Sequence, residues 1–266
     1  MARGSLVGPG TARALALDGA APPVLALHGF GGTPLEVELV IEAARELGLR
    51  AAAPLLPGHG THVRDLARTT WEDWVAAARA AFEQLAASGP VVVAGLSMGS
   101  LLAAHLAATE GPRVRGLVML ANAVWLARPW PSLPLRALRA LHAPDFWIPK
   151  AGADLADPEA SATHLTYDAQ PLHAALEVLR AGERVREELG RIRAPALVIH
   201  GAKDRVCPAS NARRVMALLG SSRRRVVIMP RSRHIVTRDY DKGAVLGELV
   251  TFLRELTGAA HAPVEP

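Results

Sequence analysis

Short runs of consecutive apolar residues alternate along this chain with longer segments whose apolar residues recur at helical spacing. A run such as PVLALH at 23–28 or VVVA at 91–94 is typical of a strand that is buried on both faces. Strands that alternate with helices predict an α/β fold, with a mostly parallel central sheet covered by helices on both faces. The expected strands lie at 14–18, 23–28, 50–53, 91–94, 114–120, 196–200 and 225–229.

Capping signals mark where two of the helices begin. The segment TPLE at 33–36 has the form of a capping box, in which the threonine caps the helix, the proline takes its first position and the glutamate closes the box. The segment TWED at 70–73 has the same form. Further helices are expected at 209–219 and 240–257, each followed by a glycine. The helix that begins after Thr70 should bury one face, formed by Trp71, Trp74, Val75, Ala78, Phe82 and Leu85.

The stretch 122–190 interrupts the alternation of strands and helices. It contains three of the five tryptophans and seven prolines. An apolar insertion directly after a central strand predicts a cap or lid over a binding site, with an ordinary peripheral layer of helices as the alternative. We therefore expect a core formed by 1–121 and 191–266, with short tails at 1–10 and 259–266, and a cap formed by 122–190.

Composition argues against several classes of protein. Half of the 266 residues are apolar, which is enough for a large core. The net charge is +5, but the basic residues are scattered and no nucleic-acid recognition motif is evident, so no nucleic-acid partner is expected. The longest apolar stretch, 117–127, is interrupted by Asn122 and is shorter than a membrane span, so no stable membrane insertion is expected.

The first residues lack the charged start and apolar run of a signal peptide. Cys207 is the single cysteine, so no disulfide within the chain is possible. Both features favour a cytoplasmic location.

The segment Gly95-Leu96-Ser97-Met98-Gly99 provides the most specific chemical signal. It lies between an expected buried strand and an expected helix, which is the context of a nucleophile elbow. The turn is so tight that the residues two before and two after the serine must lack side chains, and the serine is held in a strained conformation. Ser97 is therefore the candidate nucleophile, with a small-residue turn around a buried serine as the alternative.

A serine hydroxyl needs a base to accept its proton, and the base needs a further group to hold its tautomer. With this type of elbow, the acid and the histidine follow the serine along the chain, each just after the carboxyl end of a strand. Of the ten histidines, only His234 follows the last expected strand at close range. Asp204 follows the strand before it, whereas Asp239 and Asp241 are expected to begin the final helix. Ser97, Asp204 and His234 are the expected catalytic triad.

Two backbone N–H groups are expected to stabilise the oxyanion. One belongs to Met98, directly after the nucleophile, and the other to Phe30 in the HGFGG loop after the strand at 23–28. The loop is not a dinucleotide fingerprint, because Pro34 takes the position of its third glycine.

Two other groups of residues are alternative candidates for a functional site. His59 and His62 are three residues apart, but no further ligand motif completes a metal site. Cys207 lacks an elbow and is expected to be a small buried residue. We therefore expect neither a metal nor a cofactor.

From about residue 20 to 257 the chain resembles the α/β-hydrolase superfamily, and most of all bacterial monoacylglycerol lipases and related small carboxylesterases. The matching segments are HGFGGTP, LPGHGTH with TTWEDW, GLSMG, GAKDRVCP and SRHIVTRDYDK. The resemblance implies the α/β-hydrolase fold, the same triad and the same oxyanion pair. It also implies that Asp168, in the Tyr-acid-x-x-Pro segment 167–171, helps to hold glycerol hydroxyls, although that family usually has Glu there.

The expected function is therefore cofactor-free hydrolysis of carboxylic esters through an acyl-enzyme. The substrate is expected to be a monoacylglycerol or another short- to medium-chain ester, with Leu135, Leu138 and Leu141 forming part of an acyl channel. Hydrolysis of an amide or carbon–carbon bond is one alternative, and a non-catalytic ligand-binding protein of the same fold is another. The protein is expected to be a monomer or a homodimer.

Overall fold

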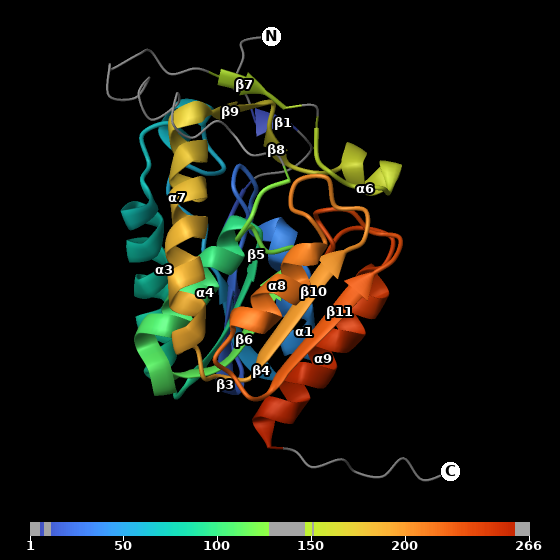
Figure 1. Ribbon diagram of the computed structural model, residues 1–266. Helices are drawn as coiled ribbons and strands as arrows, with labels where there is room; N and C mark the ends of the chain where they lie inside the picture. The colour runs from blue at the N-terminus through green and yellow to red at the C-terminus, as the bar shows by residue number, and fades with distance from the viewer. Residues whose placement is uncertain (1–5, 8–11, 128–146, 151, 259–266) are drawn as a thin grey trace.

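The computed structural model describes residues 6–7, 12–127, 147–150 and 152–258 (Figure 1). Its centre is a seven-stranded sheet with the order β11-β10-β6-β5-β3-β4-β2. Every neighbouring pair in this sheet is parallel except β2 with β4. The strands are β2 (Leu15–Leu17), β3 (Ala20–Leu27), β4 (Leu49–Ala53), β5 (Val91–Leu96), β6 (Val114–Leu120), β10 (Ala196–Gly201) and β11 (Arg224–Met229).

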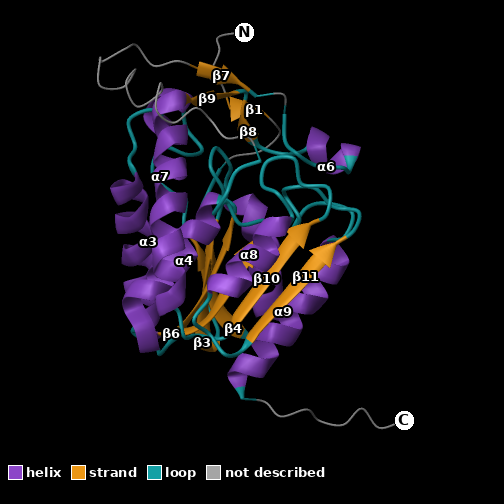
Figure 2. Cartoon of the chain, in the orientation of Figure 1, coloured by secondary structure: helices purple, strands orange, loops and turns teal. Residues whose placement is uncertain are grey.

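Helices cover both faces of this sheet, as Figure 2 shows. On one face lie α3 (Trp71–Ala86), α4 (Met98–Glu110), α7 (Leu172–Glu188) and α8 (Ser210–Leu218). On the other lie α1 (Glu38–Glu46) and α9 (Lys242–Thr257). Shorter elements are α2 (Val63–Leu66) and the 3-10 turns η1 (Pro34–Val37), η2 (Gly111–Arg113) and η3 (Leu189–Arg191).

The central strands have continuous apolar sequences because both of their faces are buried. Along β5, Val91 and Val93 join the core on the side of α3 and α4, while Val92 and Ala94 join the core beneath α1 and α9. The expected α/β architecture is confirmed, and the predicted strands all form at nearly the expected positions.

Among its described residues, the segment between β6 and β10 contributes to two small sheets and forms the helices α6 and α7. The strand β7 (Trp147–Pro149) pairs with β9 (Ala169–Pro171), and α6 (Pro158–Ala162) lies between them in the chain. The strand β8 (Thr166–Tyr167) pairs with β1 (Leu6–Val7), so part of the expected N-terminal tail is a strand. These strands lie beyond the carboxyl ends of the central sheet, whereas α7 packs against α3 and α4 (Figure 1).

The two capping predictions have different outcomes. At Thr70 both bonds of the box form, because Thr70 accepts from Asp73 N–H and Asp73 accepts from Thr70 N–H. At Thr33 the predicted positions are confirmed, since Thr33 precedes η1 and Pro34 is its first residue, but the box does not form: the Thr33 hydroxyl makes no hydrogen bond, and Glu36 accepts from the N–H of Gly29 at 2.9 Å instead. A buried backbone N–H needs a partner, and this demand turns the Glu36 side chain toward the loop.

No helix in the described part of the chain is long and apolar enough to cross a membrane.

Candidate active site

The nucleophile elbow connects β5 to α4. Ser97 has φ +55° and ψ −116°, a conformation that is rare for a residue with a side chain. A Cβ atom on Gly95 would lie 2.0 Å from the carbonyl oxygen of Gly99, and one on Gly99 would lie 2.0 Å from that of Leu27. Both glycines are therefore required by close backbone contacts, as predicted.

The predicted acid and base meet at the same edge of the sheet. Asp204 follows β10 and His234 follows β11, and these parallel strands bring both loops to their common carboxyl ends. The Nδ1 of His234 lies 2.8 Å from Oδ2 of Asp204. The other carboxylate oxygen accepts the N–H groups of Val206 and Cys207, both at 2.8 Å. Asp204 therefore holds the proton of His234 on Nδ1 and leaves Nε2 as the acceptor.

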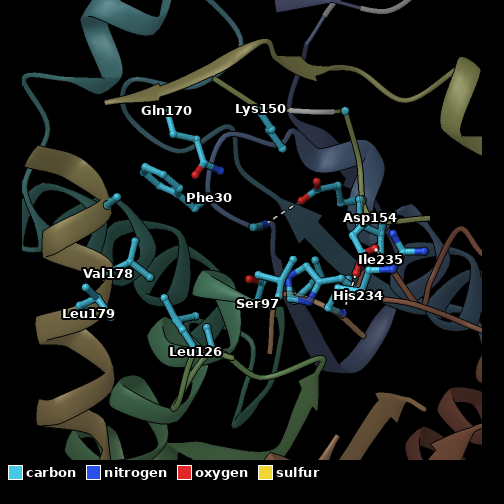
Figure 3. Close-up of a pocket in the computed structure, with 18 of the residues that line it drawn as sticks. Phe30, Ser97, Leu126, Lys150, Asp154, Gln170, Val178, Leu179, His234 and Ile235 are labelled. Atoms are coloured by element: carbon cyan, nitrogen blue, oxygen red, sulfur yellow. Dashed lines mark hydrogen bonds and ion pairs between the residues drawn. The ribbon is translucent and has the colours of Figure 1, made fainter. Parts of the chain in front are cut away.

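Ser97 and His234 line the same cavity (Figure 3). Both side chains are largely buried, with 9% and 7% of the residue surface exposed. This arrangement brings together all three residues of the expected triad from three different loops.

Charges in the site shift two pKa values. Burial by itself would raise the pKa of Asp204. The charge of His234 and the hydrogen bonds from the His200 and His234 rings instead hold that pKa well below its usual range. Burial would lower the pKa of His234, but Asp204 outweighs this effect and raises that pKa above 6.5. The pair therefore consists of an ionised carboxylate and an imidazole made more basic by it.

His200 is a neighbour of the acid that sequence reasoning missed. It is fully buried at the end of β10, and its Nε2 lies 3.0 Å from Oδ2 of Asp204 and 3.2 Å from the carbonyl oxygen of Cys207. The Asp204 carboxylate thus lies between two histidine rings. The signal was available in the sequence, because His200 is the last side chain before the Gly201 turn that leads to Asp204.

The loop after β3 contains Phe30, whose N–H is one of the two predicted oxyanion donors. The carbonyl oxygen of Gly29 contacts Nδ1 of His28 at 3.0 Å and accepts the N–H of Gly32 at 3.2 Å. Because Leu56 N–H donates to Nε2 of His28 at 3.1 Å, the ring proton of His28 resides on Nδ1. In a planar trans peptide the C=O and N–H point in opposite directions, so the N–H of Phe30 points away from His28.

Met98 is the other expected donor. It is the first residue of α4, so its N–H has no partner within the helix. Among the described residues, neither Phe30 N–H nor Met98 N–H donates a hydrogen bond. Phe30 also lines the cavity, whereas the Met98 side chain is buried in the core.

Two carboxylates hold the loop that contains His234. Asp239 accepts the N–H of Arg233 at 2.8 Å and those of Ala156 and Asp157 at 2.9 and 3.0 Å. Asp241 accepts the N–H groups of Arg231 and Ser232 at 2.8 and 2.9 Å. Asp241 does precede α9, but its carboxylate makes no capping bond. Both acids were expected only to begin the helix, and their role in this loop was missed.

The cavity has a volume of about 350 Å³ and both apolar and polar lining residues (Figure 3). The apolar ones include Phe30 and Leu126 and, on α7, Ala175, Leu176, Val178 and Leu179, which we call the apolar wall. The polar ones include Glu36, Lys150, Asp154, Gln170 and Arg205, which we call the polar wall.

The predicted substrate contacts are not brought together in this cavity. Leu135, Leu138 and Leu141 lie outside the described residues. Asp168 lies between β8 and β9, and the described lining of the cavity contains Gln170, two residues further on, but not Asp168. The apolar wall on α7 was not predicted, although its apolar residues recur at helical spacing.

The residues of the alternative candidate sites, His59, His62 and Cys207, make contacts elsewhere. Nδ1 of His59 lies 2.9 Å from the carbonyl oxygen of Pro57, while Nδ1 of His62 accepts the N–H of Arg64 at 3.1 Å. Burial, with His28 nearby, lowers the pKa of His59 to about 3. Cys207 is fully buried, as expected, and burial and Asp204 raise the pKa of its thiol well above the usual range. Atoms of Asp204, Cys207 and His234 that could ligate a metal lie within 4.8 Å of one another. The Asp204 carboxylate and the His234 imidazole, however, are hydrogen-bonded to each other.

Comparison with known proteins gives consistent matches. A family model described as "Serine aminopeptidase, S33" matches residues 20–241. The thermostable monoacylglycerol lipase of Bacillus sp. strain H-257 is 31% identical over 236 residues, which are 88% of this chain and 91% of that lipase. A structure from work on LipS and LipT, two metagenome-derived lipolytic enzymes, has a TM-score of 0.84 at 29% identity, covering 92% of this chain and 98% of its own. The monoacylglycerol lipase of Paleococcus ferrophilus has a TM-score of 0.76 over 93% of this chain and 99% of its own, and at 21% identity it is alike in fold alone.

Proposed function

Because the chain belongs to the α/β-hydrolase family described as serine aminopeptidase, S33, we propose that Ser97, Asp204 and His234 form its catalytic triad. The expected α/β-hydrolase fold and the resemblance to monoacylglycerol lipases are confirmed, and the protein is an ester-hydrolysing serine hydrolase. Its proposed substrates are monoacylglycerols or related esters with short- to medium-length acyl chains.

In the proposed mechanism, Nε2 of His234 accepts the proton of the Ser97 hydroxyl as Oγ attacks the ester carbonyl. The N–H groups of Phe30 and Met98 donate to the oxyanion. Collapse of this intermediate transfers the proton from His234 to the departing alcohol and leaves an acyl group on Ser97. A water molecule then gives a proton to His234 and attacks the acyl group, and release of the carboxylic acid returns the proton to Ser97.

One observation supports this assignment above all others. The hydroxyl on the strained elbow and the imidazole held by Asp204 occupy the same cavity, and the two expected oxyanion N–H groups donate to no described residue. A structural serine would not require the close glycine contacts at Gly95 and Gly99, which push its side chain out of the sheet edge.

The two walls of the cavity support the proposed substrate class. The apolar wall on α7 suits an acyl chain, and each buried methylene contributes about 0.8 kcal/mol to binding. The polar wall, with Lys150 and Gln170, suits the hydroxyl groups of a polar alcohol such as glycerol. We keep Asp168 as a proposed contact of that alcohol, and the stretch 122–190 as a proposed cap in which α7 supplies the inner wall.

The first experiment compares Ser97→Ala with wild type on p-nitrophenyl esters of two to twelve carbons. Turnover should fall by several orders of magnitude, while exposed Ser222→Ala stays at the wild-type rate. A fluorophosphonate should label wild type but not the variant. Near wild-type turnover by Ser97→Ala would refute the assignment.

A second experiment addresses the substrate. Rates for monoacylglycerols are compared with those for simple esters and for amides of the same acyl chain. The proposal expects marked chain-length dependence and faster hydrolysis of esters than of amides. Equal rates from two to twelve carbons would contradict an acyl-binding wall.

The remaining proposals concern context. A small-molecule ester is the proposed partner, and no nucleic-acid partner is proposed. We propose a cytoplasmic location, which rests on the single cysteine, and a monomer or homodimer in solution, which light scattering would test.

A further inference from the structure

Glu36 is a buried carboxylate that the triad mechanism does not use. Only 4% of its surface is exposed, and it lines the same cavity as Ser97. Its Oε2 accepts the N–H of Gly29 at 2.9 Å, and its Oε1 lies 3.2 Å from Nε2 of His164. Gly32 leaves the necessary space, because a Cβ atom there would lie 2.2 Å from the Glu36 carboxylate. A buried charge placed in this way calls for an explanation other than helix capping.

The bond to Gly29 acts on the peptide next to the oxyanion donor. Glu36 holds the N–H of Gly29, while His28 and the Gly32 N–H hold its carbonyl oxygen. With both ends of this residue held, the plane of the following peptide is set, and so is the direction of the Phe30 N–H. A donor contributes to catalysis only when it already points at the oxyanion, so this orientation affects the rate.

The segment before β9 holds the same loop from the other side. Thr166 Oγ1 donates to the carbonyl oxygen of Gly31 at 2.9 Å, and Nζ of Lys150 donates to Thr166 Oγ1 at 2.7 Å. His164 faces Glu36 from this segment, and Glu36 is bound on the opposite side by Thr237, whose hydroxyl donates to its backbone carbonyl at 2.6 Å. The oxyanion loop is thus held between the segment 164–166 and the loop after His234.

The charge of Glu36 is maintained by its surroundings. Burial by itself would raise its pKa, but His164, followed by His28 and Lys150, lowers that pKa to about 2. A carboxylate that stays ionised at neutral pH is a constant acceptor for the Gly29 N–H.

We propose that Glu36 is a positioning residue for the oxyanion hole, and that Thr166 completes its hold on the Gly29–Gly32 loop. The proposal rests on the proposed function, because it assumes that Phe30 N–H stabilises an oxyanion formed at Ser97. It assigns to Glu36 no contact with the reacting atoms. Its effect reaches the reaction only through the orientation of the Phe30 N–H.

The test compares Glu36→Met, which keeps the length of the side chain but removes the acceptor, with Glu36→Gln, which keeps an acceptor oxygen. Thr33→Val is the matched control, because the Thr33 hydroxyl is buried in the same turn without a hydrogen bond. For p-nitrophenyl butyrate, Glu36→Met should lower kcat by roughly 100-fold. KM should change less than about threefold, because ground-state binding makes little use of the hole. Glu36→Gln and Thr33→Val should each stay within about tenfold of wild type.

A transition-state analogue separates positioning from loss of structure. An alkyl boronic acid forms a tetrahedral anion on the serine, so its Kd should rise in Glu36→Met by the same factor by which kcat falls. Fluorophosphonate titration counts the folded active sites. The rate that gives kcat and the bound boronate that gives Kd are both expressed per counted site. Thr166→Val, which loses one bond to the loop, should lower kcat by about tenfold.

The outcomes distinguish this inference from the proposed function. An unchanged kcat in Glu36→Met, or equal losses in Glu36→Met and Glu36→Gln, would overturn the role of the acceptor. An unchanged boronate Kd beside a lowered kcat would also overturn it. Unchanged kcat in Thr166→Val would remove Thr166 from the proposal. If wild type itself is not labelled at Ser97, the proposed function fails instead.

Discussion

The elbow at 95–99 and the histidine loop at 231–241 place two reacting groups in one cavity by different physical means. Close backbone contacts shape the elbow, since two glycines lie where any Cβ would come within 2.0 Å of a carbonyl oxygen. The histidine loop depends on side-chain carboxylates from Asp204, Asp239 and Asp241, which together accept bonds from backbone N–H groups and from His234. One region is held by steric exclusion and the other by charge-assisted hydrogen bonds.

The difference predicts how each region responds to change. Steric exclusion tolerates no added atom, so a substitution in the elbow should damage the fold and the site together. Hydrogen bonds to a carboxylate are lost one at a time, so substitutions in the histidine loop should separate activity from stability.

The largest expected effect is that of Asp204→Asn. An amide at this position favours the wrong tautomer of His234 and cannot stabilise the imidazolium, so kcat should fall by roughly 10⁴-fold, a barrier increase of about 5 kcal/mol. An amide oxygen can still accept the N–H groups of Val206 and Cys207, so the free energy of unfolding should fall by no more than about 2 kcal/mol, much less than the rise in the barrier. Stopped-flow ester hydrolysis and calorimetry on the same sample provide the two measurements. A variant with normal kcat would show that Asp204 is not the catalytic acid.

Gly99→Ala should have the next largest effect, mainly on folding. The new methyl group would lie 2.0 Å from the carbonyl oxygen of Leu27 and 2.7 Å from that of His28, so the backbone would have to shift. We expect a loss of about 4 kcal/mol or more in the free energy of unfolding, measured by urea denaturation.

The matched control for that variant is Gly243→Ala. Gly243 lies in α9, and a Cβ atom there would have no neighbour within 4 Å. This substitution should stabilise the protein by up to about 1 kcal/mol. Equal stability of the Gly99→Ala and Gly243→Ala variants would contradict the steric account of the elbow.

Asp239→Asn should have a smaller and more selective effect. Asp239 is fully buried, and its two oxygens accept four N–H groups, from Arg233, Ala156, Asp157 and Tyr240. In the variant, an amide nitrogen takes the place of one of these oxygens and cannot accept the N–H groups that it faces. The free energy of unfolding should therefore fall by about 2 kcal/mol. Exposed Asp18→Asn is the control, and it should unfold at the wild-type denaturant concentration. Unchanged stability of Asp239→Asn would mean that this carboxylate does not hold the loop.

The same contrast explains what the sequence could predict. The elbow, the buried strands and the order of Ser97, Asp204 and His234 were predictable, because each depends on local sterics or on chain order along a parallel sheet. The close contacts at Gly95 and Gly99 follow from neighbours within the turn and from the adjacent strand β3.

The contacts that support the site were not predictable in the same way. Glu36 matches a capping box equally well in sequence, and only the buried N–H of Gly29 decides where its side chain points. Asp239 binds N–H groups more than 80 residues away in the chain, at Ala156 and Asp157. Similarly, the pairing of β1 with β8 joins two segments, 6–7 and 166–167, that are far apart in the chain. Such partners depend on the folded arrangement and leave no periodic pattern.

The pH dependence of the reaction should come from the histidine loop and not from the elbow. Ser97 is held by backbone contacts that do not titrate near neutral pH, whereas His234 must be unprotonated at Nε2 to act as a base. Because Asp204 raises the pKa of His234 above 6.5, kcat/KM should fall as pH decreases, with a midpoint above 6.5. A series of kcat/KM values from pH 5 to 9 with a neutral ester measures this midpoint.

Stability should depend on the same group with the opposite sign. A histidine whose pKa is higher in the folded protein stabilises the fold when it is protonated, and this contribution is lost as pH rises through the folded value. Across that range the protein should therefore gain activity while the contribution of His234 to the free energy of unfolding decreases. In the Asp204→Asn variant the carboxylate that raises the pKa is absent, so the midpoint of its residual activity should move to lower pH. A wild-type midpoint below 6.5, or one unchanged in Asp204→Asn, would separate the pH dependence from the pair and contradict the electrostatic account of this loop.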